Sequence, residues 1–126
     1  MAQIEIIVSV TWFAFIILMV YVNYMVISTG QKVNHNQNAL ITCICGASLT
    51  LFWKWSIIDM AYIWLTLILV YWLLFDISLN LVRKLPIQYL GKVAITDLFL
   101  RKYSFGQPIL FKIMCLALLN LVYLLV

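Results

Sequence analysis

Residues 57–82 read IIDMAYIWLTLILVYWLLFDISLNLV, a run in which only Asp59 and Asp76 are charged. An α-helix rises about 1.5 Å per residue, so roughly 20 residues cross the ~30 Å hydrocarbon core of a bilayer. The run is longer than that and predicts a membrane-spanning helix. Ser56, three residues before Asp59, predicts a capping box at its start. Pro86 is expected to stop it, because proline blocks helix continuation.

Further apolar runs lie on both sides of this one, and together they predict about four spanning helices. The expected spans cover residues 4–27, 38–55, 57–82 and 108–126. Gly30 is suited to closing the first helix, and Pro108 to the first position of the last one. The second helix is expected to begin near Asn36 or Asn38, whose side chains can accept hydrogen bonds from its free N–H groups.

The composition of the whole chain requires lipid as its solvent. Its 126 residues are 67% hydrophobic and only 10% charged, whereas average globular proteins carry about 25% charged residues. Too few charges remain to cover a water-facing surface. We therefore expect residues 1–126 to form a single all-α, polytopic membrane domain.

The basic residues decide the expected orientation in the membrane. Most of them lie in or beside the loops at 28–38 and 83–107, namely Lys32, Arg83, Lys84, Lys92, Arg101, Lys102 and Lys112. The other side holds Lys54, which with Trp53 and Trp55 resembles an interfacial anchor. The positive-inside rule then places the basic loops in the cytoplasm of a bacterium or its equivalent, with both termini outside. Anionic lipid headgroups, and not nucleic acid, are the expected counter-charge.

The segment between residues 86 and 103 is harder to interpret. Ile95, Phe99 and Tyr103 would form one apolar stripe on a helix, but the charged residues scatter around the helical wheel. The sequence leaves two alternatives open: a short helix at headgroup level or under its neighbours, and a segment without a helix.

A polar stripe marks the end of the predicted helix at 57–82. Asp76, Asn80 and Lys84 follow Trp72 at intervals of four residues, with Arg83 on nearly the same face. An ionisable group inside a span is costly and is a functional candidate, for example as an ion or proton site. The structural alternative is an interfacial acid held by Arg83 or Lys84. The candidate functional residues are Asp76, Asn80, Arg83 and Lys84.

Small residues in the second predicted helix indicate a packing face. Thr42, Gly46 and Thr50 recur every four residues, which lets another helix approach closely. The neighbour could come from the same chain or from a second copy.

No metal or cofactor site is expected. His35 is the only histidine and has no second ligand at metal-binding spacing. Cys43 and Cys45 would point about 200° apart on a helix. The chain also has no phosphate-binding glycine loop, nucleophile elbow or paired carboxylates, so no enzyme is predicted.

One segment resembles known sequences. The residues from Phe75 through Arg83-Lys84-Leu85-Pro86 to Asp97 are similar to part of uncharacterised small membrane proteins of Bacteroidota and their tailed phages. Those proteins are expected to have glycine where this chain has Lys84. The resemblance implies no established activity. It implies one structural unit where the helix meets the basic face, formed by Asp76, Asn80, Arg83, Gly91 and Asp97.

Two classes of function fit these features. The first is a non-catalytic membrane component or accessory subunit, whose helices pack with copies of itself or with a larger membrane complex. The alternative is a small oligomeric channel, transporter or holin-like pore, with a pathway lined by Asp76, Asn80, Asn23 and Asn120. A small multidrug exporter would need an acid in the middle of its first helix, where this chain has only Glu5 at the edge.

Overall fold

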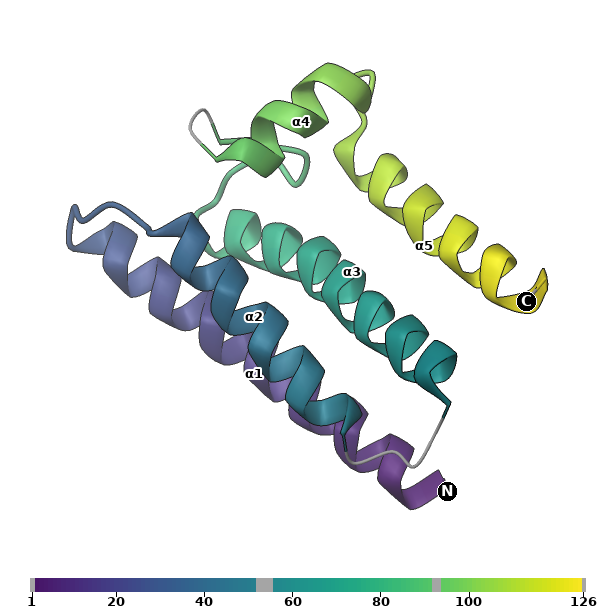
Figure 1. Cartoon of the computed structure of the whole chain (residues 1–126). Helices are drawn as coiled ribbons and strands as arrows, with labels where there is room; N and C mark the ends of the chain where they lie inside the picture. Colours follow the sequence, from purple (N-terminus) through teal and green to yellow (C-terminus); the bar gives the residue numbers. More distant parts are fainter. Residues whose placement is uncertain (1, 52–55, 92–93, 126) are drawn as a thin grey trace.

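The structure is a computed structural model that describes residues 2–51, 56–91 and 94–125 (Figure 1). The helices are α1 (Ala2–Ser28), α2 (His35–Thr50), α3 (Ile57–Val82), α4 (Ile95–Tyr103) and α5 (Pro108–Leu125). The described residues contain no strand. The predicted all-α class is therefore confirmed.

The third helix organises the bundle. It contacts α1, α2 and α5, and Figure 1 shows it between α1 and α2 on one side and α5 on the other. The short helix α4 lies at the end where α3 finishes and α5 begins, and it contacts α5. Both chain termini lie at the opposite end, which we call the terminal end; the end with α4 is the basic end.

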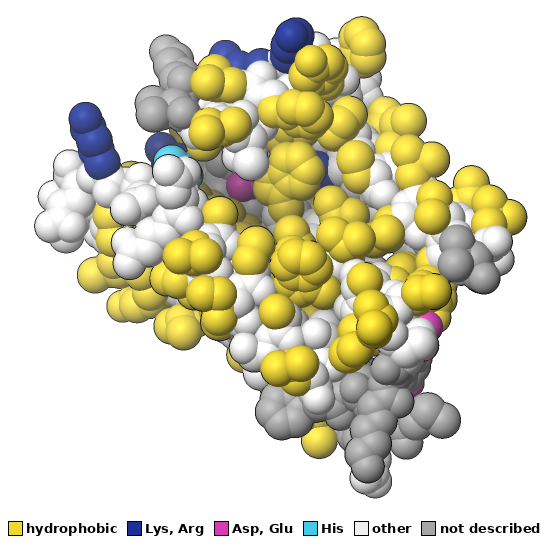
Figure 2. Space-filling view, in the orientation of Figure 1, with side chains coloured by type: hydrophobic (Ala, Val, Ile, Leu, Met, Phe, Trp, Pro, Cys, Tyr) yellow, Lys and Arg dark blue, Asp and Glu magenta, His cyan; other side chains and the backbone are white. Residues whose placement is uncertain are grey.

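Three helices are long and apolar enough to cross a membrane, by length and composition. They are Glu5–Ser28 within α1, Ile57–Val82 and Pro108–Leu125. Yellow hydrophobic side chains cover most of the face drawn in Figure 2, while dark blue Lys and Arg side chains gather toward the basic end. The chain is therefore a helical membrane protein.

The prediction of four spans is wrong for the described residues, because α2 has only 16 residues. Its length of about 24 Å falls short of a ~30 Å hydrocarbon core. It begins at His35, earlier than expected, because the side chain of Asn34 accepts a hydrogen bond from the Gln37 N–H (3.1 Å) and caps the helix. The expected anchor at Trp53, Lys54 and Trp55 lies outside the described residues.

Local signals at the ends of the other helices are confirmed. The Ser56 hydroxyl accepts from the Asp59 N–H (3.2 Å), and the Asp59 carboxylate accepts from the Ser56 N–H (3.3 Å), so the predicted capping box is present. Helix α3 spans the predicted residues, and α5 begins at Pro108 as expected.

The chain leaves α3 through a left-handed residue. Lys84 has a φ of 56°, and the N–H groups of Lys84 and Leu85 donate to the carbonyls of Leu81 (3.0 Å) and Asn80 (2.9 Å). This pairing is the Schellman motif, in which glycine is usual because it adopts positive φ without steric cost. Lys84 stands where the resemblance leads us to expect that glycine.

Tryptophan side chains join the first three helices. Trp12 is 2% exposed, and its indole N–H donates to the Leu67 carbonyl on α3 (2.9 Å). The indole of Trp64 donates from α3 to the Cys43 carbonyl on α2 (3.1 Å). Gly46 faces both rings, since an added Cβ there would lie 3.3 Å from Trp64 and 3.4 Å from Trp12.

The expected packing face of small residues lies inside this chain. Thr42, Gly46 and Thr50 are all buried on α2. The structure thus uses the face for contact between helices of one copy.

Helix α4 resolves one alternative that the sequence leaves open, since residues 95–103 are helical. Leu100 is its fully buried residue, with 0% exposure. The apolar stripe of Ile95, Phe99 and Tyr103 is exposed. The sequence left open whether this segment is helical, and it did not single out Leu100 as the residue that packs.

Candidate functional site

The Asp76 carboxylate of α3 is neutralised by a lysine from another helix. Lys112 of α5 is 3% exposed and forms an ion pair with Asp76. Its ammonium also donates to the Trp72 carbonyl (3.2 Å) and lies 4.7 Å from the centre of the Trp72 ring. A buried charge is tolerated in such a place when it is paired and hydrogen-bonded. The pair joins α3 to α5 near the basic end.

The other members of the predicted stripe do not contact Asp76. Asn80, which is 5% exposed, donates its amide to the carbonyls of Ile87 (3.1 Å) and Tyr89 (2.9 Å). The guanidinium of Arg83 lies 5.9 Å from the centre of the Tyr89 ring. Lys84 is exposed. Asn80 therefore holds the loop after α3, and the expected partners of Asp76 lie elsewhere.

The same loop is bound from its other side by α4. Arg101 donates to the carbonyls of Leu90 (2.8 Å) and Gly91 (3.2 Å). Gly91 also lies so close to the Asp97 carboxylate that an added Cβ would collide with it. The loop and the start of α4 consequently form one packed unit above the end of α3.

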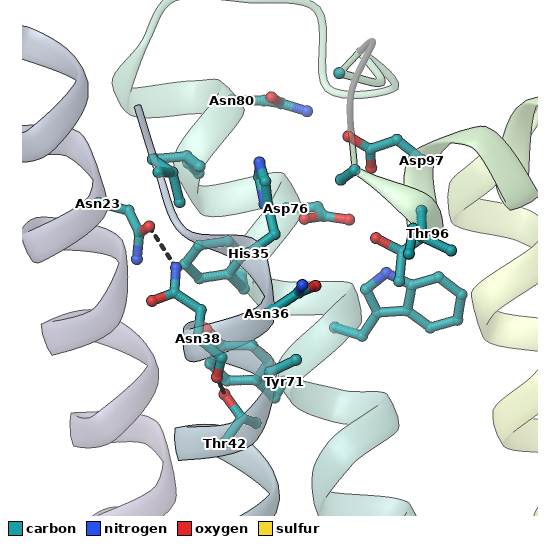
Figure 3. Close-up of a pocket in the computed structure, with 18 of the residues that line it drawn as sticks. Asn23, His35, Asn36, Asn38, Thr42, Tyr71, Asp76, Asn80, Thr96 and Asp97 are labelled. Carbon is teal, nitrogen blue, oxygen red and sulfur yellow. Dashed lines mark hydrogen bonds between the residues drawn. The ribbon is translucent and has the colours of Figure 1, made fainter. Parts of the chain in front are cut away.

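A cavity of about 640 Å³ lies beneath this unit, between α2, α3 and the start of α4. Figure 3 shows polar side chains around it, and Asp76, His35, Thr96 and Asp97 face a common space. The labelled lining residues are Asn23, His35, Asn36, Asn38, Thr42, Tyr71, Asp76, Asn80, Thr96 and Asp97. The residues that the resemblance groups together, Asp76, Asn80, Arg83, Gly91 and Asp97, all line this cavity.

The wall of the cavity beside α1 is closed by an amide pair. The Asn38 side chain donates to the Asn23 side chain (2.6 Å), and Asn23 donates to the Met19 carbonyl (2.7 Å). Below this level, the helices meet through the buried core around Trp12 and Ile16. The cavity is thus lined above by polar groups and bordered below by packed apolar side chains.

A second polar cluster joins α3 to α5 at the terminal end. Tyr123 donates to the Asp59 carboxylate (2.6 Å), and Tyr62 donates to the side-chain amide oxygen of Asn120 (2.6 Å). The rings of Tyr62 and Tyr123 stack with centroids 3.8 Å apart. We call this group the tyrosine clasp. Asn120, expected from the sequence as a candidate pathway residue, belongs to it.

Lys112 and the buried Tyr71 are site residues that sequence reasoning did not single out. The sequence did contain one indication for Lys112. It lies one turn inside the last predicted span, at the same end of the bundle as Asp76. Tyr71 offered none, since an aromatic residue in an apolar run is ordinary. Within the described residues, no three His, Cys, Asp or Glu side chains form a group that could hold a metal ion.

In comparisons with protein families, with curated proteins and with solved structures, nothing matches the chain.

Proposed function

We propose that this protein is a non-catalytic accessory subunit of a larger membrane complex. The observation that carries the proposal is the ion pair between Asp76 and Lys112. An acid that conducts ions must be free to exchange its charge with a passing ion, whereas this carboxylate is held by a buried lysine. Its contact with α5 gives it a structural role instead.

The other polar residues of the alternative pathway support the same proposal. Asn80 binds the loop after α3, Asn23 binds Asn38 of α2, and Asn120 accepts from Tyr62. Each amide thus serves a different contact within the chain. Asp76, Asn80 and Asn23 line the cavity at the basic end, whereas Asn120 lies in the tyrosine clasp at the terminal end, so the four groups do not form a continuous polar line through the bundle.

The short helix α2 supports association with another polypeptide. Within the part of the chain that the structure describes, α2 is a helix of 16 residues, roughly 6 Å shorter than a ~30 Å hydrocarbon core. Such a mismatch is relieved by thinning the bilayer or by contact with neighbouring protein. A partner seated at α2 would cover this short face, and we propose that side of the bundle as the contact.

The orientation that we propose follows from the basic end. The short helix α2 carries the chain back from the basic end to the terminal end between α1 and α3, so both termini lie at one end (Figure 1). The positive-inside rule then places Lys32, Arg83 and Arg101 in the cytoplasm and the two termini outside. A reporter enzyme that is active only in the cytoplasm, fused after Val126, should therefore be inactive, and the same reporter inserted after Gln88 should be active. The reverse pattern would overturn the orientation.

The substitution Asp76→Asn distinguishes the accessory role from the pore alternative. We expect purified protein in vesicles to pass no more protons, Na⁺ or K⁺ than protein-free vesicles, with or without the substitution. The variant should instead accumulate to a lower level in the membrane, because Lys112 loses its counter-charge. A conductance that Asp76→Asn changes, at unchanged abundance, would favour the pore.

A further inference from the structure

The cavity at the basic end contains hydrogen-bond donors that the chain itself does not use. The Tyr71 hydroxyl and the Trp72 indole N–H are buried and have no hydrogen-bond partner among the described residues. Both residues line the cavity, and Tyr71 is only 8% exposed. Buried polar groups in native structures almost always have a partner. Donors without a partner in the chain leave room for acceptor oxygens supplied from the cavity, by water or by a ligand.

The charges around the cavity favour a negatively charged ligand. Lys32, Arg83, Asp76 and Asp97 all line it, but the charge of Asp76 is already neutralised by Lys112. Two cationic side chains thus stand against one remaining carboxylate, Asp97. A phosphate group is suited to this arrangement, since Lys and Arg bind it through charge-assisted hydrogen bonds.

Part of the remaining lining is apolar. Ile27, Ile68, Phe75, Leu79 and Ile95 contribute hydrocarbon to the wall. In Figure 2 the cavity appears as a hollow with an acidic side chain inside and the cyan histidine, His35, beside it, and yellow hydrophobic side chains border it. Its volume of about 640 Å³ falls within the roughly 300–1,000 Å³ of ligand pockets.

From these features we propose that the cavity binds one glycerophospholipid with an anionic headgroup. Its phosphate lies toward Arg83 and Lys32, its ester carbonyls supply acceptors for the buried donors, and its acyl chains follow the apolar wall. Asp97 favours a headgroup that carries hydroxyl groups, as phosphatidylglycerol does. The inference stands apart from the accessory role, because the cavity is formed within one chain.

The test is native mass spectrometry of the full chain in a mild non-ionic detergent, titrated with single lipids. We expect phosphatidylglycerol to bind with a stoichiometry of one and more tightly than phosphatidylcholine, whose headgroup offers no donor to Asp97. Glycerophosphoglycerol, which is phosphatidylglycerol without its acyl chains, carries the same phosphodiester and headgroup. It should not be retained at the same concentrations, and equal retention would overturn the lipid assignment in favour of a free phosphate site.

Matched variants separate the cavity from general attraction to a basic surface. Arg83→Gln should weaken phosphatidylglycerol binding about tenfold, the loss typical of one charge-assisted hydrogen bond. Trp72→Phe should weaken it about fivefold through the lost indole donor. Lys102→Gln removes a charge at the same end of the bundle without touching the cavity, and should leave binding unchanged.

Two further results would overturn the proposal. If the lipid were held only by attraction to the basic surface, Lys102→Gln would weaken phosphatidylglycerol binding as much as Arg83→Gln, and Trp72→Phe would not change it. Ala39→Leu tests the cavity independently in case the Trp72→Phe protein does not fold. It narrows the cavity from the exposed side of α2. Unchanged phosphatidylglycerol binding by a folded Ala39→Leu protein would place the lipid elsewhere.

Discussion

Lys112 of α5 and Asp76 of α3, separated by 36 residues in the chain, form an ion pair. The lysine is the more buried partner, with 3% of its side chain exposed against 27% for the acid. The pair and the tyrosine clasp join α3 to α5 near their two ends. Among the described helices, α5 contacts α3 most and the short helix α4 less, so its contacts with α3 decide its position.

The ion pair predicts strong coupling between two substitutions. Asp76→Asn leaves the buried Lys112 ammonium without a counter-charge, and we expect it to lower the free energy of unfolding by about 3 kcal/mol. Adding Lys112→Met removes the stranded charge and should restore most of that loss. Thermal unfolding in detergent, followed by circular dichroism, measures both effects. Lys102→Met, at an exposed position, is the control. If neither Asp76→Asn alone nor Lys112→Met alone changed the free energy of unfolding, the pair would not stabilise the bundle.

Asn80 predicts a local effect on the loop after α3. Asn80→Asp keeps the shape of the side chain but replaces the donor with a carboxylate that faces the carbonyls of Ile87 and Tyr89. A buried side chain that loses its hydrogen bonds costs about 1–3 kcal/mol, so the loop should detach and become open to protease. Limited proteolysis with mapped cleavage sites measures this. Gln88→Glu introduces the same charge at an exposed place in the loop and should not change the cleavage pattern.

Gly46 predicts that α2 tolerates side chains on one face only. Gly46→Leu would push into Trp12 and Trp64 and should destabilise the bundle by about 2 kcal/mol or more, as overpacking in a core does. Ala47→Leu adds a larger side chain one residue away, on the exposed side, and should be close to neutral. The amount of folded protein extracted from membranes distinguishes them. Equal yields would contradict the packing described for α2.

The tyrosine clasp predicts a graded loss. Tyr123→Phe removes the hydrogen bond to Asp59 and keeps the ring stacked on Tyr62, so it should cost about 1 kcal/mol. Tyr123→Ala also removes the ring. It should lower stability further, through the lost apolar contact and through about 1 kcal/mol from the lost ring stacking. Unfolding in detergent measures the series. Tyr21→Phe, at an exposed position of α1, is the matched control and should not change stability.

Helix ends could be predicted from sequence where a local signal specifies them. Ser56 with Asp59, and Pro108, set the starts of α3 and α5, because capping and the fixed φ of proline act within one turn. The start of α2 was less certain, since several Asn residues in the polar loop could serve as the cap. Only the structure shows that Asn34 does.

The partner of Asp76 could not be predicted, because it depends on which helix packs beside α3. The sequence placed Arg83 and Lys84 nearest to it along the chain. Yet Arg83 lies beside Tyr89, and Lys84 takes the left-handed conformation that ends the helix. The cavity could not be predicted for the same reason, because its lining comes from α1, α2, α3 and the region around α4. Contacts between distant segments follow from the packing, which no local pattern encodes.

If the chain works as part of a larger membrane complex, its native mass should show this most directly. The protein should be extracted gently from its natural membrane and, separately, from cells that make it alone, and both samples analysed by native electrophoresis and mass spectrometry. We expect the natural sample to migrate with other polypeptides in a complex larger than the isolated chain. Identical migration of both samples, as a monomer or as an assembly of this chain alone, would contradict it.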